Sequence, residues 1–159
     1  MTDLSRPASR ERVVMLPSDA ERRALIARES GAALVSDTLP LRANLSAIEN
    51  ITMVFQYRTN TYAGEANDIA WGLLKAVDGT GCADKRDPDL SFEERFLTKL
   101  LRAVAMQPRL ILIDRPGQLL PDTDYPKYLN RTLLALDDRI EQCWILDYIW
   151  NKPLYDSRG

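Results

Sequence analysis

Short apolar runs recur along this chain and are separated by longer segments in which polar residues dominate. The runs are continuous rather than alternating, and the first two are bounded by Pro17 and Gly31. A continuous apolar run of this length is typical of a strand that is buried on both faces of a parallel sheet. We therefore predict strands at residues 12–16, 32–35, 110–113 and 143–146.

The segments between these runs carry apolar residues at the spacing of a helix. Serine and glutamate stand three positions apart at Ser46 and Glu49, and again at Ser91 and Glu94. This spacing predicts two helices that begin with a capping box. The predicted helices cover residues 18–28, 46–55, 66–77, 91–104 and 121–136.

The helix that begins after Ser91 has a regular apolar face. Its apolar residues recur at intervals of four, from Phe92 through Phe96 and Leu100 to Val104. Such spacing places all four on one side of the predicted helix. Strands that alternate with helices along the chain predict an α/β fold with a layered parallel sheet.

The composition describes one globular domain and excludes several classes of function. The chain has 159 residues and a formal net charge of -2, without a basic stripe that would suggest nucleic acid. No apolar segment approaches the roughly 20 residues of a membrane span, so we expect no membrane insertion. Residues 1–11 are expected to form a flexible leader without a signal-peptide core, which favours a cytoplasmic location. The absence of histidine excludes Ser-His-Asp chemistry and histidine-bound zinc within this chain.

Two motifs in the second half of the chain stand in a fixed relation to each other. Residues 90–94 read Leu-Ser-Phe-Glu-Glu, and the helix that they open ends with Arg-Ala-Val-Ala at residues 102–105. Pro108 follows, and then comes an apolar strand that ends with Asp-Arg-Pro at residues 114–116. This order and spacing resemble the signature helix and Walker B strand of ATP-binding cassette (ABC) ATPases. The family pattern reads Leu-Ser-Gly-Gly-Gln, Arg-Ala-Leu-Ala, Pro, an apolar strand and Asp-Glu-Pro.

The resemblance covers residues 32–148 and implies how the chain is organised. It implies a truncated ABC-ATPase-like α/β fold, related to P-loop NTPases, with a parallel sheet flanked by helices. This fold would form a single domain over residues 12–149. Residues 46–89 correspond to the small helical subdomain of the family, and residues 150–159 are expected to form a C-terminal tail.

Three residues match family positions that contact the nucleotide or its metal. Asp114 matches the Walker B aspartate, and it is either a surviving Mg²⁺ ligand or a structural acid that pairs with a nearby arginine. Ser91 is either a retained phosphate contact or simply the N-cap of its helix. Asp37 stands at the Q-loop glutamine, whose amide reaches both the metal and the membrane partner in the family.

Five positions depart from the family pattern in ways that oppose ATP hydrolysis. Arg115 replaces the catalytic glutamate, and a guanidinium stays protonated and cannot act as a base. Phe92 fills the space of a signature glycine, whereas Glu93 and Glu94 place negative charge where a phosphate would approach. Tyr148 falls near the switch histidine and is either a packing residue or a partner contact.

The phosphate loop of the family is missing from this sequence. An ABC ATPase carries Gly-x-x-x-x-Gly-Lys upstream of its Q-loop, but no lysine here follows a glycine, and the first lysine is Lys75. Backbone amides and the lysine of that loop normally cradle the phosphates. We therefore expect no ATP turnover by the isolated chain and no cofactor, with weak binding of ATP and Mg²⁺ as the remaining option.

The resemblance implies a non-hydrolysing regulatory or scaffolding partner of an ABC transport system. Its partner would be an ABC permease or an ABC ATPase subunit, which would hold the chain at the inner face of the membrane. One alternative is the asymmetric half of a composite ATPase, contributing signature-side contacts to ATP bound by a partner. A second alternative is reuse of the fold for an unrelated binding role.

Overall fold

A computed structural model describes residues 11–58 and 60–156. Its centre is a parallel sheet of four strands: β1 (Glu11–Leu16), β2 (Ala33–Val35), β3 (Ile111–Asp114) and β4 (Cys143–Tyr148). Their spatial order is β1-β4-β3-β2, so β3 pairs with both β2 and β4. The predicted parallel sheet is confirmed, although β4 continues two residues beyond the apolar run, to Tyr148.

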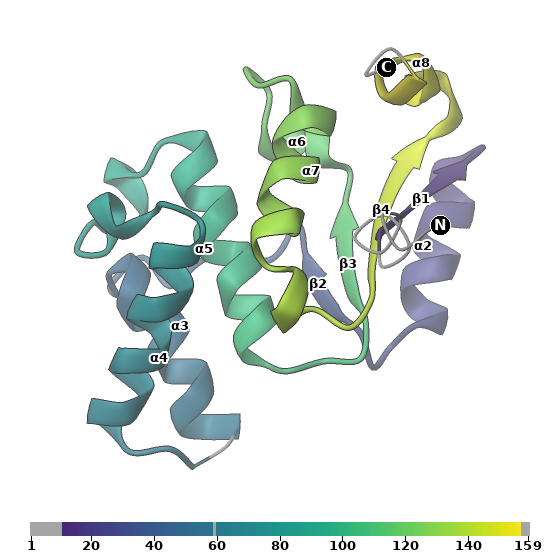
Figure 1. Ribbon diagram of the computed structural model, residues 1–159. Helices are drawn as coiled ribbons and strands as arrows, with labels where there is room; N and C mark the ends of the chain where they lie inside the picture. The colour runs from purple at the N-terminus through teal and green to yellow at the C-terminus, as the bar shows by residue number, and fades with distance from the viewer. Residues whose placement is uncertain (1–10, 59, 157–159) are drawn as a thin grey trace.

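Helices connect the strands and cover both faces of the sheet (Figure 1). On β3, Ile111 and Ile113 point into the larger core, whereas Leu112 joins a smaller core with Leu25. This alternation follows from the strand period of two residues. The helices of eight residues or more are α2 (Asp19–Arg28), α3 (Ala47–Arg58), α4 (Ala63–Ala76), α5 (Phe92–Ala105) and α7 (Tyr125–Ala135).

The short elements fill the connections between these helices and strands. The single-turn helices are η2 (Thr80–Cys82), η3 (Asp87–Asp89), η4 (Asp137–Arg139) and η5 (Ile149–Asn151), and the short α-helices are α6 (Pro116–Leu119) and α8 (Lys152–Asp156). Tyr155 of α8 is buried, and its ring meets the ring of Tyr125 edge-on at a centroid distance of 5.8 Å. The segment after β4 is therefore helical up to Asp156 and packs against the core.

The helices α3 and α4 form a layer of their own beside α5, set away from the sheet (Figure 1). Ile51 and Phe55 of α3 and Leu73 of α4 are buried in this layer. The helical segment predicted between residues 46 and 89 is thus present and joins the sheet through α5, because α5 contacts both α3 and β2.

Both predicted capping boxes are confirmed. The Ser46 hydroxyl accepts from the backbone N–H of Glu49, and the Glu49 carboxylate accepts from the backbone N–H of Ser46. Ser91 and Glu94 make the same reciprocal pair at the start of α5. Phe92 is on the same side of the helix as the buried Phe96, yet its side chain is 48% exposed. Phe92 is the first residue of α5 and extends beyond the edge of the core that buries the rest of this face.

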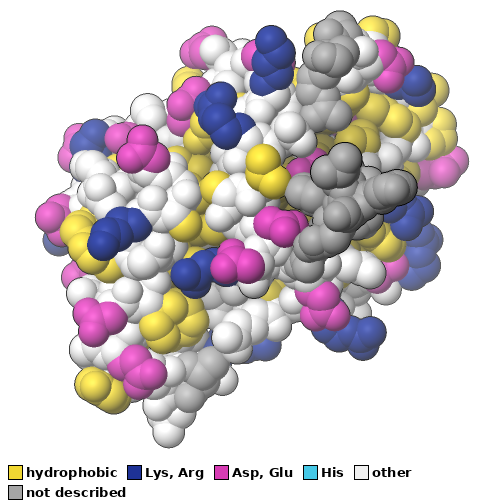
Figure 2. Space-filling view, viewed as in Figure 1, with side chains coloured by type: hydrophobic (Ala, Val, Ile, Leu, Met, Phe, Trp, Pro, Cys, Tyr) yellow, Lys and Arg dark blue, Asp and Glu magenta, His cyan; other side chains and the backbone are white. Residues whose placement is uncertain are grey.

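The surface carries charges of both signs. On the face shown in Figure 2, lysine and arginine side chains are interspersed with aspartate and glutamate. None of the helices among residues 11–58 and 60–156 has the length and apolar character needed to cross a membrane.

Candidate functional site

The carboxyl end of the sheet gathers most of the chemically interesting side chains. Asp114 is the last residue of β3 and is 1% exposed. The chain then turns sharply, because Arg115 has a left-handed φ of 49° and Pro116 begins α6. Ser36, which follows β2, is also buried beside Asp114. Ligands of open parallel sheets bind at this end of the strands, so we take this cluster as the candidate site.

Arg22 of α2 binds directly to Asp114. Its Nη1 atom donates to both carboxylate oxygens of Asp114 at 3.0 Å, across 92 positions of sequence. Ser18 caps α2 by accepting from the backbone N–H of Glu21, which fixes the first turn of the helix. Arg22 therefore faces the sheet in the turn before Leu25, and both side chains are buried. Although burial alone lowers the pKa of Arg22, its contacts with Asp19 and Asp114 raise that pKa overall.

Asp19 links Arg22 to the end of β4. Its Oδ1 atom accepts from Arg22 Nε at 2.9 Å and from the Tyr148 hydroxyl at 2.7 Å. The hydroxyl of Tyr148 and the guanidinium of Arg22 together hold the pKa of Asp19 well below its usual range. The ring of Tyr148 also stacks on Trp150, with centroids 4.4 Å apart. Tyr148 thus belongs to the cluster as a hydrogen-bond donor to a carboxylate.

Arg115 also contacts the carboxylate of Asp114. Its Nη2 atom lies 3.3 Å from Asp37 Oδ1 and 3.4 Å from Asp114 Oδ2. Its buried Nε atom lies 3.3 Å from Asp114 Oδ1, within ion-pair distance, but makes no hydrogen bond within the described residues. Ser36 donates to Asp114 Oδ2 at 2.9 Å. Asp114 therefore pairs with two arginines, and Arg22, which donates to both of its oxygens at 3.0 Å, is the stronger partner.

The residues of this cluster do not fit a magnesium-bound nucleotide. Mg²⁺ requires oxygen ligands in near-octahedral geometry at about 2.0–2.1 Å, whereas the Asp114 oxygens are engaged by two arginines and Ser36. Across residues 11–58 and 60–156, no three His, Cys, Asp or Glu side chains come together as a metal site. The loop between β1 and α2 offers only Pro17, which lacks an N–H, and Ser18, whose hydroxyl is used as a cap.

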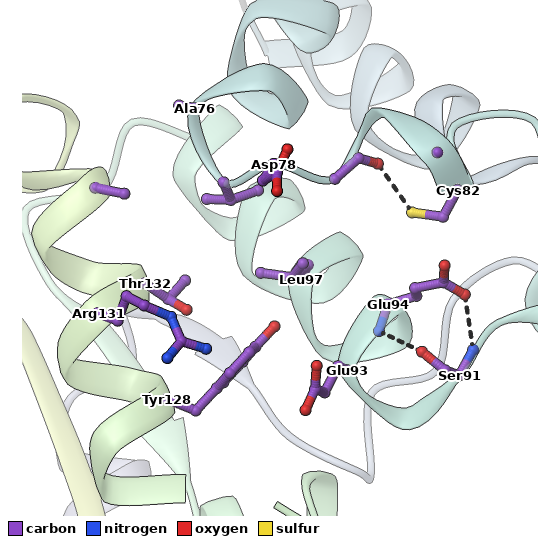
Figure 3. Close-up of a pocket in the computed structure, with 14 residues that line it drawn as sticks. Ala76, Asp78, Cys82, Ser91, Glu93, Glu94, Leu97, Tyr128, Arg131 and Thr132 are labelled. Carbon is purple, nitrogen blue, oxygen red and sulfur yellow. Dashed lines mark hydrogen bonds between the residues drawn. The ribbon is translucent and has the colours of Figure 1, made fainter.

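The signature-like residues lie apart from this cluster, around a cavity of about 530 Å³ between α5, α7 and the end of α4 (Figure 3). Ser91 and Glu94 face each other there, and Glu94 also pairs with Lys85 at 3.3 Å. Glu93 accepts from the Thr123 hydroxyl at 3.0 Å. These internal partners leave the Ser91 hydroxyl and both carboxylates engaged at the start of α5.

A third location holds Phe92. It lines a cavity of about 280 Å³ together with Asp37, so that Phe92 faces a different space from its neighbour Ser91. The predicted positions therefore divide into three groups. Asp114, Arg115, Asp37 and Tyr148 share the cluster at the strand ends, whereas the signature-like residues do not reach it.

Sequence reasoning missed Arg22 and Asp19 because both lie in the helix before the resemblance begins. One local signal was available. Arg22 stands three positions before Leu25, so helical spacing places Arg22 on the same inward-facing side as that leucine. A cation at such a position needs a buried acid, and its partner could be any acid far along the chain.

Asp147 was also missed. It is 2% exposed and accepts four hydrogen bonds, from the Tyr125 and Tyr155 hydroxyls, from the Asn151 amide and from the Tyr148 backbone N–H, all at 2.8–3.0 Å. Burial and the adjacent carboxylate raise the pKa of both tyrosines. Its hydrogen bonds attach η5 and α8 to the end of β4, so we assign Asp147 a structural role.

Comparisons with known proteins agree with this architecture. No protein-family profile matches the chain. A glutamate transport ATP-binding protein, GluA of Corynebacterium efficiens, is 28% identical over 119 residues, which is 75% of this chain and 47% of that protein. The chain thus spans about half the length of the curated relative that it matches.

Solved structures show the same fold. A dimeric ATP-binding cassette bound to ADP and Pi aligns with 84% of this chain and 59% of its own length, at a TM-score of 0.60 and 23% identity. A putative metal-chelate type ABC transporter aligns with 85% of this chain and 62% of its own, at a TM-score of 0.63 and 20% identity. The chain therefore has the fold of these ATP-binding cassettes, in agreement with the fold that the two motifs predicted, and it spans less than two thirds of these structures.

Proposed function

We propose that this chain is a non-hydrolysing ABC-ATPase-like protein that acts as a regulatory or scaffolding partner of an ABC transport system. The observation that carries this proposal is the contact of Arg22 with both oxygens of Asp114 at 3.0 Å. In the family that aspartate serves Mg²⁺ and ATP. Here a positive side chain of the same molecule takes the place of the metal.

The junction between β1 and α2 supports the proposal. A phosphate loop stands between a strand and a helix, with glycines and a lysine that surround the phosphates. The strand and the helix are both present beside Asp114, but only Pro17 and Ser18 separate them. This junction supplies neither a lysine nor a ring of free amides, so a triphosphate would lose its main donors.

Arg115 supports the proposal because it cannot act as the general base of ATP hydrolysis. It stands where the family has its catalytic glutamate, and it binds Asp37 and Asp114 instead of orienting water. General-base assistance is typically worth about 10²–10⁴-fold in rate, and an arginine supplies none of it. Without this base and without the phosphate loop, we expect the chain to act by binding other proteins of the transport system rather than by hydrolysing ATP.

The helical layer of α3 and α4 is the surface that we expect to meet the partner. Three aromatic side chains are exposed there: Tyr57 (81%), Tyr62 (72%) and Trp71 (40%). Aromatic residues are enriched among the residues that dominate binding energy at protein interfaces. An ABC permease is the expected partner at this layer, and a second ATP-binding subunit is the expected partner at the signature face around Ser91. Either partner would hold the chain at the cytoplasmic face of the membrane.

Calorimetric titration with Mg-ATP tests the loss of nucleotide binding. We expect no heat of binding up to about 1 mM, because the nucleotide lacks a cradle and Arg22 fills the metal position. Binding that disappears in Asp114→Ala but persists in Asp138→Ala, a control on an exposed acid, would overturn the proposal.

Affinity capture tests the partner. The chain is expected to recover an ABC permease or an ATP-binding subunit, and Trp71→Ala should reduce the recovery. Trp150→Ala serves as the control, because it removes an exposed tryptophan that lies outside the helical layer. Recovery of neither class of partner would contradict the proposal, even if nucleotide binding is absent as expected.

A further inference from the structure

Lys99 is a buried cation that no motif accounts for. It lies in the middle of α5 and is 5% exposed. Its ammonium group has three donors, yet among the residues that the structure describes it makes one hydrogen bond, to the backbone carbonyl of Ser36 at 3.1 Å. Burial lowers the pKa of Lys99, in line with a charge that is only partly compensated.

A cavity of about 280 Å³ lies at this lysine. Pro40, Leu41, Phe96 and Leu119 provide apolar walls, and Lys99 and Arg95 provide positive charge. Pockets for drug-sized ligands measure about 300–1,000 Å³, so this space suits a smaller molecule. Lys99 therefore has donors left over at the wall of a space that a small ligand could fill.

The acids near the cavity are already engaged. Asp87 accepts from Arg95 Nε at 2.7 Å, and Asp37 accepts from Arg115 Nη2 at 3.3 Å. The Nη2 atom of Arg95 donates to the backbone carbonyls of Asp87 and Leu90, whereas its Nη1 atom makes no hydrogen bond among the described residues. Lys99 and Arg95 therefore keep cationic donors at the cavity, beside two carboxylates that are each paired with an arginine.

We propose that this cavity binds a small organic monocarboxylate, with Lys99 as the counterion and Arg95 as a second donor. One negative charge matches Lys99, the one lysine among the described residues that line this cavity, and the apolar walls would hold the hydrocarbon part of the ligand. A phosphate dianion fits less well, because Asp37 and Asp87 also line the cavity and would repel its second charge. This site is independent of nucleotide binding and does not rest on the proposed function.

Benzoate is the first probe, with benzamide as its neutral counterpart. In ¹H–¹⁵N spectra of the full chain, benzoate is expected to shift the amides of Leu41, Phe96 and Lys99 with millimolar affinity. Benzamide should bind at least tenfold more weakly, because it has the same ring but no charge. Inorganic phosphate should also bind at least tenfold more weakly than benzoate.

Lys99→Met tests the role of the ammonium, because methionine keeps most of the length of lysine and suits a buried position. The variant should bind benzoate at least tenfold more weakly than the wild type. Lys75→Met changes an exposed lysine of α4 and should leave the affinity unchanged. Equal binding by the Lys99→Met and wild-type chains, or equal binding of benzoate and benzamide, would overturn the proposal.

A measurement on the wild type keeps the test decisive if the variant fails to fold. Benzoate affinity should fall as the pH rises through the pKa of Lys99, which burial places below the usual lysine value. The affinity should be constant below that pKa, where the ammonium is charged. An affinity that is unchanged across this range, or no binding of benzoate at neutral pH, would overturn the proposal. Tighter binding of phosphate than of benzoate would overturn the monocarboxylate assignment.

Discussion

Replacing Arg22 by methionine removes the charge that faces Asp114 while keeping most of the buried stem. The Arg22 side chain is 10% exposed and that of Asp114 is 1% exposed, so the remaining carboxylate would stay in the interior. Removing one partner of a buried ion pair typically costs about 3–5 kcal/mol. Ser36 and Arg115 still contact Asp114, which favours the lower end of that range.

We therefore expect Arg22→Met to lower the free energy of unfolding by about 3 kcal/mol. For a chain of this size, each kcal/mol lowers the melting temperature by about 2–4 °C, so the expected decrease is about 6–12 °C. Urea unfolding followed by far-UV circular dichroism measures the free energy. Arg23→Met is the matched control, because that side chain is 68% exposed on the same helix and should cost less than about 0.5 kcal/mol.

A double-mutant cycle separates the ion pair from simple loss of packing. Asp114→Leu alone should be destabilising, because it leaves the buried Arg22 with only Asp19, which is half exposed, as its acidic partner. The double variant, Arg22→Met with Asp114→Leu, should cost much less than the sum of the single changes. Additive costs, or an Arg22→Met variant within about 0.5 kcal/mol of the wild type, would refute the assignment of Arg22 as the internal counterion of Asp114.

Three further changes test other parts of the structure. Ser91→Ala removes the N-cap of α5 and should cost about 1 kcal/mol in urea unfolding, with Ser91→Gly costing less; equal losses would contradict the cap. Asp19 has a lowered pKa in the folded protein, so its stabilisation is present above about pH 3.9 and is lost as the pH falls toward the folded pKa. Tyr148→Phe should raise that pKa, as carboxyl ¹³C NMR would show, and should move acid unfolding to higher pH. Lys99 has a lowered pKa, so the wild type gains stability as the pH rises toward about 10.4. Lys99→Met removes this buried charge, so its stability relative to the wild type should fall between pH 7 and 10, as urea unfolding would show; a difference that stays constant would contradict this account.

Local features of the fold could be predicted from sequence because their causes are local. The capping box of Ser91 and Glu94 joins residues three positions apart, so its spacing is visible in the chain. Both faces of β3 are covered, which requires apolar residues at most positions of the strand, so the strand can be predicted from the continuous apolar run at residues 110–113. The two ABC-like motifs preserve the spacing between α5 and β3, which predicted the fold class.

The strand order and the contacts at the candidate site were decided by tertiary structure. Arg22 and Asp114 are 92 positions apart, and they meet because β1 lies beside β4, and β4 lies beside β3. Helical spacing places Phe92 on the same side of α5 as Phe96, but packing at the first turn of α5 leaves Phe92 half exposed. The same spacing gave no sign that Lys99 is buried. The periodicity of a helix or strand shows on which face a side chain lies. Whether that side chain is buried, and which residue it contacts, depends on which distant segment of the chain packs against that face.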